Sequence, residues 1–119
     1  MVKGKKITGG KYKKQRKKKL YERPGQKKIV KLGKEKRKSK RINGGNKKIF
    51  LHSDEKINVV ENGKTKKLKI ENVLRTPSNR FLARQKILTK GTIVKTKKGE
   101  VEITNRPTQE GIINGKLIA

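Results

Sequence analysis

The sequence predicts a mainly β protein, a small closed or nearly closed antiparallel β-barrel with a long, basic, extended N-terminal arm. The first 48 residues carry 22 Lys and Arg but only two acids, Glu22 and Glu35, so this part has a net charge of +20 out of +28. About 23 apolar residues follow between positions 49 and 118, in short runs separated by turn residues. They suffice for the core of one small domain. We therefore divide the chain into a basic arm, 1–46, and a barrel domain, 47–119.

The arm is expected to be disordered when it is free. Its positive charges repel one another, and its few apolar residues show no period of 2 or 3.6. Several glycines interrupt it, which disfavours a long helix. Residues 13–22 could form a short helix on a phosphate surface, but in solution their adjacent positive charges oppose it.

The first strands of the barrel are expected around a hairpin. Residues 48–51 are a short apolar run, and 52–55 resemble a turn. The β-type runs 57–59 and 68–70 flank Asn62-Gly63, which is typical of a hairpin because both turn positions favour positive φ. The charged residues beside this pair leave open whether the turn has two residues or more. Residues 76–79 mark the next break.

The remaining strands follow the same pattern. Residues 92–96 and 100–104 alternate between apolar and polar side chains around a turn at 97–99. A loop at 106–111 leads to a last strand at 112–118, where Gly115 could form a bulge. No helix is expected in this half. Five or six short strands at even spacing are typical of a barrel, and closure removes exposed strand edges.

Composition excludes several functions. Without cysteine the chain has no disulfide and no thiolate metal site. The start is not a secretory signal, and no apolar run is long enough to span a membrane, so we expect a soluble intracellular protein. The single histidine, His52, has no Cys, Ser or carboxylate arrangement typical of catalysis. We therefore expect no enzyme, no catalytic residue, no metal, no cofactor and no small-molecule substrate.

The charge of the arm instead predicts binding to a polyanion, because each neutralised phosphate releases condensed counterions. Ordering about 40 residues at roughly 1–2 kcal/mol each opposes binding by several tens of kcal/mol. An arm threaded among many phosphates of a folded RNA could offset this cost, whereas a few contacts on a duplex could not. The cations predicted to bind RNA are Lys3, Lys5, Lys6, Lys11, Lys13, Lys14, Arg16, Lys17, Lys18, Lys19, Arg37, Lys38 and Arg41.

Glycine pairs and a basic cluster extend this predicted site. Gly9-Gly10 and Gly44-Gly45 would let the backbone approach a phosphate, although the second pair could equally be a flexible joint. Asn46 would add a hydrogen bond. On the barrel we expect a second RNA contact at Arg75, Arg80, Arg84 and Lys90, with an ordinary basic surface as the alternative.

The aromatic residues favour recognition of shape and phosphates over reading of bases. The chain has only two Tyr and two Phe. A reader of single-stranded bases usually presents an aromatic platform for stacking. Phe50 and Phe81 have strand-like surroundings, so we expect both in the core.

Four segments resemble a known family, and together they span nearly the whole chain: 8–10, 41–48, 87–93 and 103–114. Their sequences are TGG, RINGGNKK, ILTKGTI and ITNRPTQEGIIN. In this order and spacing they resemble the archaeal and eukaryotic (e-type) small-subunit ribosomal protein family eight, in its short archaeal form. The loop departs from the family at 106–111, where Gly-Gln-Asp is expected in the middle, and residues 13–40 are unusually rich in lysine.

The resemblance implies a small β-barrel with an extended arm, bound to small-subunit ribosomal RNA beside other small-subunit proteins in the cytoplasmic ribosome. We therefore expect a structural constituent of that subunit. The alternative is a ribosome-assembly or nucleic-acid-compacting factor that leaves the mature particle. A membrane-surface binder would require a basic amphipathic helix, which the glycines disfavour.

Overall fold

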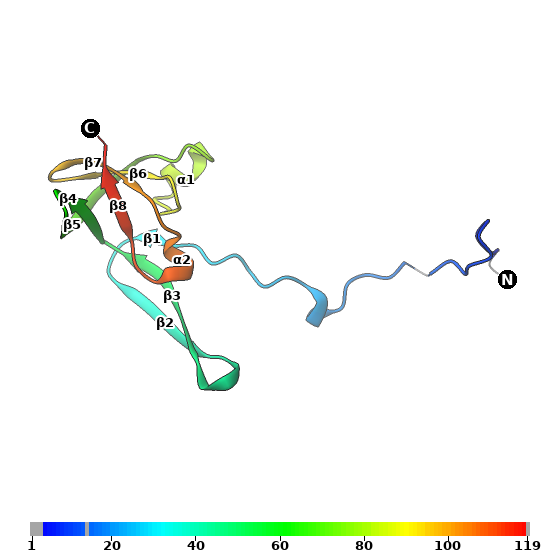
Figure 1. Ribbon diagram of the computed structural model, residues 1–119. Helices are drawn as coiled ribbons and strands as arrows, with labels where there is room; N and C mark the ends of the chain where they lie inside the picture. The colour runs from blue at the N-terminus through cyan, green and yellow to red at the C-terminus, as the bar shows by residue number, and fades with distance from the viewer. Residues whose placement is uncertain (1–3, 14, 119) are drawn as a thin grey trace.

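The computed structural model describes residues 4–13 and 15–118 and confirms a mainly β fold. Figure 1 shows a barrel, a projecting hairpin and an N-terminal segment that runs away from both. The elements in chain order are η1 (Leu20–Glu22), β1 (Lys31–Leu32), β2 (Lys36–Arg41), η2 (Asn43–Gly45), β3 (Lys47–Asp54), β4 (Lys56–Glu61), β5 (Lys64–Arg75), α1 (Arg80–Arg84), β6 (Ile93–Thr96), β7 (Gly99–Ile103), α2 (Pro107–Glu110) and β8 (Asn114–Leu117).

Within the described residues, β4 to β8 form a closed barrel in the order β4-β5-β6-β7-β8. Strands that follow one another along the chain pair antiparallel, whereas β4 and β8 pair parallel. This parallel pair is a consequence of strand number, because the first and last of five alternating strands run in the same direction. The long strand β5 pairs with β4 and then with β6, and its register with β6 shifts at Asn72 and Arg75. Such irregularities bend a strand as a barrel requires.

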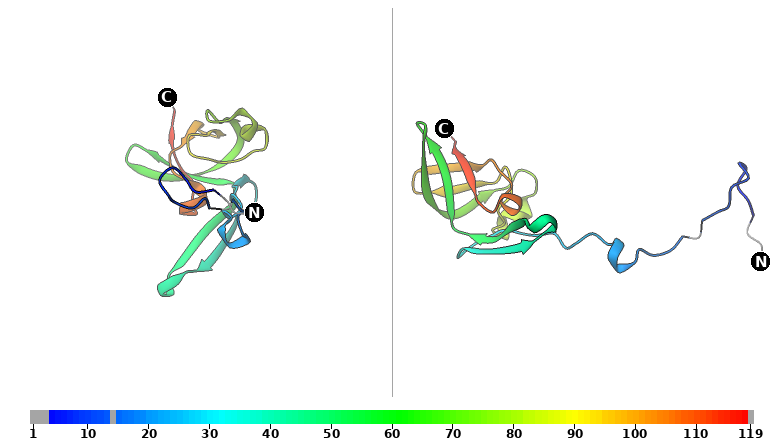
Figure 2. Two further views of the ribbon diagram at one scale, coloured as in Figure 1. Left: turned by 90° about the vertical axis from the view of Figure 1, so that its right-hand side faces the viewer. Right: turned by 60° about the horizontal axis from the view of Figure 1, so that its bottom comes forward.

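A second, three-stranded sheet has the order β1-β3-β2. β2 and β3 form an antiparallel hairpin that projects from the barrel, and η2 is its tip (Figures 1 and 2). The backbone N–H of Ile42 donates to the carbonyl oxygen of Asn46 at 2.8 Å, which closes the tip. The other end of β3 enters the core through Leu51, which is fully buried. β3 therefore connects the hairpin rigidly to the barrel.

The core follows the two-residue period of the strands. Its buried members come from the barrel strands β4 to β7, from β3 and from three connecting segments: Val30, Leu51, Ile57, Val59, Ile70, Val73, Leu88, Val94, Val101, Ile103 and Ile113. Val30 lies within the predicted arm, yet it is 1% exposed, and its carbonyl oxygen accepts a hydrogen bond from Leu88 N at 2.9 Å. The domain boundary at residue 46 stays a prediction, and in this structure Val30 belongs to the core while β1 and β2 pair with β3.

Both hairpin turns of the barrel lie where the sequence predicts them. Glu61 pairs with Lys64 across Asn62 and Gly63, whose φ values are 48° and 75°. The turn therefore has two residues in the left-handed region, as Asn-Gly favours. Thr96 pairs with Gly99, so the second turn comprises Lys97 and Lys98 only.

Two predictions from local patterns are wrong. β3 continues through Asp54, so residues 52–54 are strand and the bend falls at Glu55. Gly115 forms no bulge, since β8 pairs with β7 without a register shift. A Cβ on Gly115 would lie 2.5 Å from Val101 Cγ1 and 2.8 Å from the carbonyl oxygen of Glu102. Glycine is needed there because neighbouring strands approach too closely for any side chain.

The described residues also contain two short helices in the half where none was expected. The side chain of Asn79 caps α1 by accepting a hydrogen bond from Phe81 N at 2.9 Å. α2 begins with Pro107 and ends at Glu110, and the next residue, Gly111, caps it with a φ of 74°. With five and four residues, these helices are too short to show a helical period in the sequence.

The described residues before Val30 are all exposed, and they extend away from the barrel in Figure 1 and in the right-hand view of Figure 2. Among the described residues of this stretch the only helical turn is η1, a 3-10 turn of three residues. A short helix over 13–22 on a phosphate surface stays a prediction. Nowhere in the ranges 4–13 and 15–118 is there a helix of the length and apolarity needed to cross a membrane.

Candidate nucleic-acid interface

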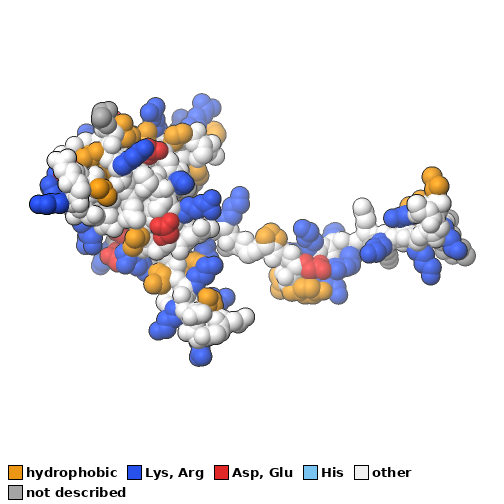
Figure 3. All heavy atoms as spheres, in the orientation of Figure 1, with side chains coloured by type: hydrophobic (Ala, Val, Ile, Leu, Met, Phe, Trp, Pro, Cys, Tyr) orange, Lys and Arg blue, Asp and Glu red, His pale blue; other side chains and the backbone are white. Residues whose placement is uncertain are grey.

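The described cations of the N-terminal segment are nearly all uncompensated (Figure 3). The exception is Arg16, which holds both carboxylate oxygens of Glu22 at 2.6 and 2.8 Å. The guanidinium, helped by the backbone N–H of Lys19, lowers the pKa of Glu22. Among the described residues, no other predicted arm cation before Val30 forms an ion pair: Lys5, Lys6, Lys11, Lys13, Lys17, Lys18 and Lys19. Lys3 and Lys14 lie outside the described residues.

A small loop brings several of these cations together. The backbone N–H of Lys6 donates to the carbonyl oxygen of Gly10, and the N–H of Gly9 donates to the carbonyl oxygen of Lys6, both at 2.8 Å. Lys5 and Lys11 form an isolated antiparallel β-bridge. Gly9 has a φ of 77°, and no atom lies within 4 Å of the place its Cβ would occupy. The backbone at Gly9-Gly10 is thus open to a close approach, and RNA contact there stays a prediction.

The hairpin of β2 and β3 places like charges opposite one another. Lys40 faces Lys48, and Arg41 faces Lys47. Directly opposed like charges destabilise an antiparallel pair. A polyanion against the hairpin would relieve this repulsion. Such contact also stays a prediction for Lys38, Arg41 and the tip residues Gly44, Gly45 and Asn46, which are all exposed.

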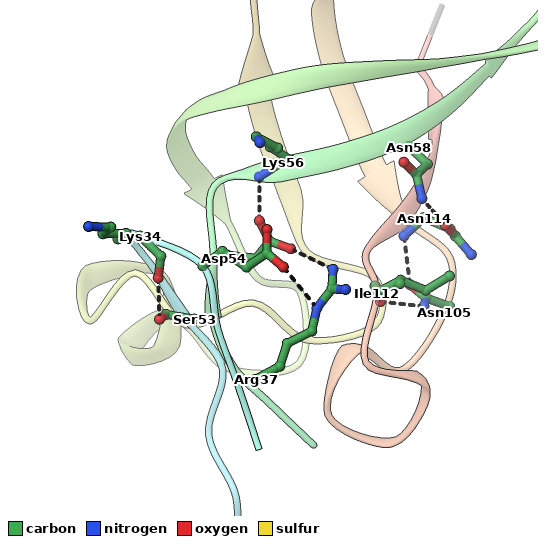
Figure 4. A network of polar contacts seen from close by, with 10 residues as sticks. Lys34, Arg37, Ser53, Asp54, Lys56, Asn58, Asn105, Ile112 and Asn114 are labelled. Carbon is green, nitrogen blue, oxygen red and sulfur yellow. Dashed lines mark hydrogen bonds and ion pairs between the residues drawn. The ribbon is translucent and has the colours of Figure 1, made fainter. Parts of the chain in front are cut away.

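Arg37 differs from its neighbours on this hairpin (Figure 4). Its Nη2 lies 3.6 Å from Asp54 Oδ2, and its Nε lies 3.3 Å from Glu35 Oε1. Asp54 is 3% exposed, and its Oδ1 also accepts a hydrogen bond from Lys56 N at 2.9 Å. A buried carboxylate requires such partners. Arg37 therefore stabilises the junction of β3 and β4.

The predicted barrel cations come from three places. Arg75 ends β5, Arg80 and Arg84 belong to α1, and Lys90 lies in the turn before β6. All four are exposed. The prediction that Phe81 belongs to the core is wrong, because this side chain is 54% exposed on α1, with the Arg80 guanidinium 5.4 Å from its ring centroid.

A cleft of about 690 Å³ gathers cations that the sequence did not single out together. Lys28, Lys48 and Arg106 line it beside Lys90, which was predicted, and Phe50 is among its walls. Phe50 is half-buried rather than fully in the core. The residues come from segments separated by up to about 80 positions, so no local spacing could have shown that they meet.

Arg106 directly follows Asn105, a member of an asparagine network that Figure 4 shows. Asn105 Nδ2 donates to the carbonyl oxygen of Ile112 at 2.8 Å and to Glu110 Oε2 at 2.9 Å, while its Oδ1 accepts from Asn114 N at 3.0 Å. Asn114 Oδ1 in turn accepts from Asn58 Nδ2 at 3.1 Å. These bonds close the loop around α2. They give the segment 103–114 a structural role beside any contact with RNA.

Comparison with known proteins identifies the family. The sequence model described as Ribosomal protein S8e matches residues 2–118. The chain is 47% identical over 114 residues to "Small ribosomal subunit protein eS8" of Nanoarchaeum equitans, covering 94% of this chain and 90% of the relative. Proteins of the same name from Staphylothermus marinus and Ignicoccus hospitalis are each 43% identical, over 95% and 96% of this chain and 91% of each relative. The names of these relatives agree with the prediction that the chain is not an enzyme. The chain belongs to the ribosomal protein S8e family.

Proposed function

We propose that this protein is a structural constituent of the small ribosomal subunit in the cytoplasm, where it binds small-subunit ribosomal RNA. One observation carries the RNA-binding part of this proposal. The cations of the described N-terminal segment and of the hairpin are exposed, and apart from Arg16 and Arg37 these predicted contacts have no acidic partner in the described chain. The names of the relatives support the placement in the small subunit.

The mechanism is neutralisation of phosphates together with recognition of RNA shape. The N-terminal segment lies between RNA helices and lets their phosphates approach one another, while each contact releases counterions. The hairpin and the barrel surface at Arg75, Arg80, Arg84 and Lys90 fix the position of the protein. Neighbouring small-subunit proteins complete its environment.

Sedimentation tests this function. A native cell extract is run on a gradient at low salt and again after a wash near 0.5 M monovalent salt, with magnesium kept (a concentration chosen to weaken exposed charge contacts). We expect the protein to remain in the small-subunit peak at about one copy per particle. Retention on precursor particles alone would instead identify an assembly factor, and loss from all particles at high salt would identify a non-specific polycation.

A further inference from the structure

The cleft beside Phe50 combines an aromatic ring with an unusual concentration of positive charge. Among the described residues that line it are five cations and no acid. Its lining comes from residues 25–28, from Lys48 and Phe50 of β3, from Lys90 and from residues 106–109 at the start of α2. Its volume of about 690 Å³ is within the roughly 300–1,000 Å³ of ordinary ligand pockets.

Phe50 and Lys28 both line this cleft, and they are in contact with each other. The ammonium of Lys28 lies over it, 2.9 Å from the centroid, and that of Lys48 lies 6.0 Å away. Burial, together with the positive charges of Lys48 and Lys40, lowers the pKa of Lys28. The cation that covers the ring is therefore held among like charges, and an anion in the cleft would draw it away from the ring.

We propose that this cleft binds one unstacked nucleotide of the RNA, with its base stacked on Phe50 in place of the Lys28 ammonium and its phosphates paired with Lys48, Lys90 and Arg106. The inference rests on the proposed function, because this nucleotide belongs to the same RNA. It adds a contact with a base to an interface otherwise made of phosphate contacts.

The chemistry of the walls favours a nucleotide over other occupants. A phosphate alone would leave the apolar face of the Phe50 ring without a partner, whereas the face of a base covers it. A paired base of a duplex is stacked on both faces and cannot enter a concave site. Ser78, Thr89 and Gln109 at the walls supply the hydrogen-bonding groups that a base edge or ribose requires.

Ultraviolet cross-linking tests the proposal on the full-length protein. The wild-type chain is reconstituted into small subunits and irradiated, and mass spectrometry then locates each peptide joined to a nucleotide. We expect a cross-link at Phe50 to a nucleotide that is unpaired in the RNA. In the same particles, chemical probing should show that this base is protected.

Matched variants make the test specific. Phe50→Leu should remove the cross-link and the protection of that one base while the remaining footprint persists, and Phe50→Tyr, which keeps a ring, should restore both. Phe81→Leu removes an exposed ring outside the cleft and should leave that base protected. With the isolated RNA fragment that contains the base, Phe50→Leu should weaken binding by about fivefold or more.

The outcomes separate this inference from the proposed function. Cross-links to RNA elsewhere in the wild-type chain, with none at Phe50, would overturn the inference and leave the function standing. A protein segment cross-linked in the cleft would overturn it as well. Failure of the wild-type chain to bind small-subunit RNA at all would refute both. Because the wild-type cross-link needs no variant, the test holds even if Phe50→Leu does not fold.

Discussion

The guanidinium of Arg37 lies 3.6 Å from the carboxylate of Asp54, a side chain that the strands around it bury almost completely. This pair connects β2, within the basic part of the sequence, to the point where β3 passes into the barrel. Two adjacent cations of one strand, Arg37 and Lys38, thus have different roles. Both are exposed, but only Arg37 has acidic partners among the described residues.

Replacing Arg37 should therefore lower stability. Arg37→Gln removes the charge beside buried Asp54, and we expect a loss of roughly 1–2 kcal/mol, below the 3–5 kcal/mol of a fully buried pair because the Arg37 side chain is 42% exposed. Urea unfolding measures this loss. Lys38→Gln is the matched control and should leave unfolding unchanged. Equal stability of the two variants would contradict the role given to Arg37.

Gly115→Ala should destabilise the barrel by about 1–3 kcal/mol, the usual cost of overpacking. The new Cβ would clash with Val101 and with the backbone of Glu102. Gly33→Ala is the control, since no atom lies within 4 Å of its Cβ position. Thermal unfolding compares the melting temperatures of the two variants with that of the wild type. An unchanged melting temperature for Gly115→Ala would show that the strands can separate at little cost in free energy.

Two truncations locate the boundary of the folded domain. Deleting residues 1–24 removes 11 Lys and Arg but keeps Val30, so the protein should unfold as the full chain does. Deleting residues 1–46 also removes Val30, β1 and β2, and we expect a clear loss of stability, of which Val30 alone accounts for about 1.5–3 kcal/mol. Equal stability of both truncations would instead support a boundary at residue 46.

The shorter truncation also tests the electrostatic mechanism. The affinity for small-subunit RNA should become less dependent on salt, because log K falls with log salt by about 0.7–0.9 for each phosphate contact. The loss of 11 cations should reduce this slope by several units. Filter binding at a series of salt concentrations measures it, and an unchanged slope would mean that this segment does not touch the phosphates.

Glu61 should give part of the stability a dependence on pH. Hydrogen bonds from Lys98 and then Lys66 lower the pKa of Glu61 below its ordinary value of 4.5. A lowered folded-state pKa stabilises the protein above the unfolded pKa, and this contribution disappears as the pH falls through the folded value. The difference in stability between wild type and Glu61→Gln should therefore vanish once the pH is below the pKa of Glu61 in the folded protein. Titration followed by NMR should give a pKa below 4.5 for Glu61.

Local patterns predicted the parts of this fold that depend on local chemistry. Asn62-Gly63 marks a two-residue turn because both residues tolerate positive φ, and apolar residues such as Ile57, Val59, Val101 and Ile103 alternate because every second side chain of a strand faces the core. The basic N-terminal part is visible in composition alone. These features require no knowledge of distant residues.

The sequence by itself thus determined the class of fold, the order of most strands and the polycationic character of the chain. Only the tertiary structure decided that Val30 joins the core, that Gly115 sits where a Cβ would clash with the neighbouring strands, that Arg37 pairs with Asp54, and that Phe50 meets Lys28 and Arg106 in one cleft. The physical reason is the separation along the sequence of the residues that interact. Turn chemistry and strand alternation act between neighbours in sequence, whereas burial, close approach and charge pairing depend on which distant segments barrel closure brings together.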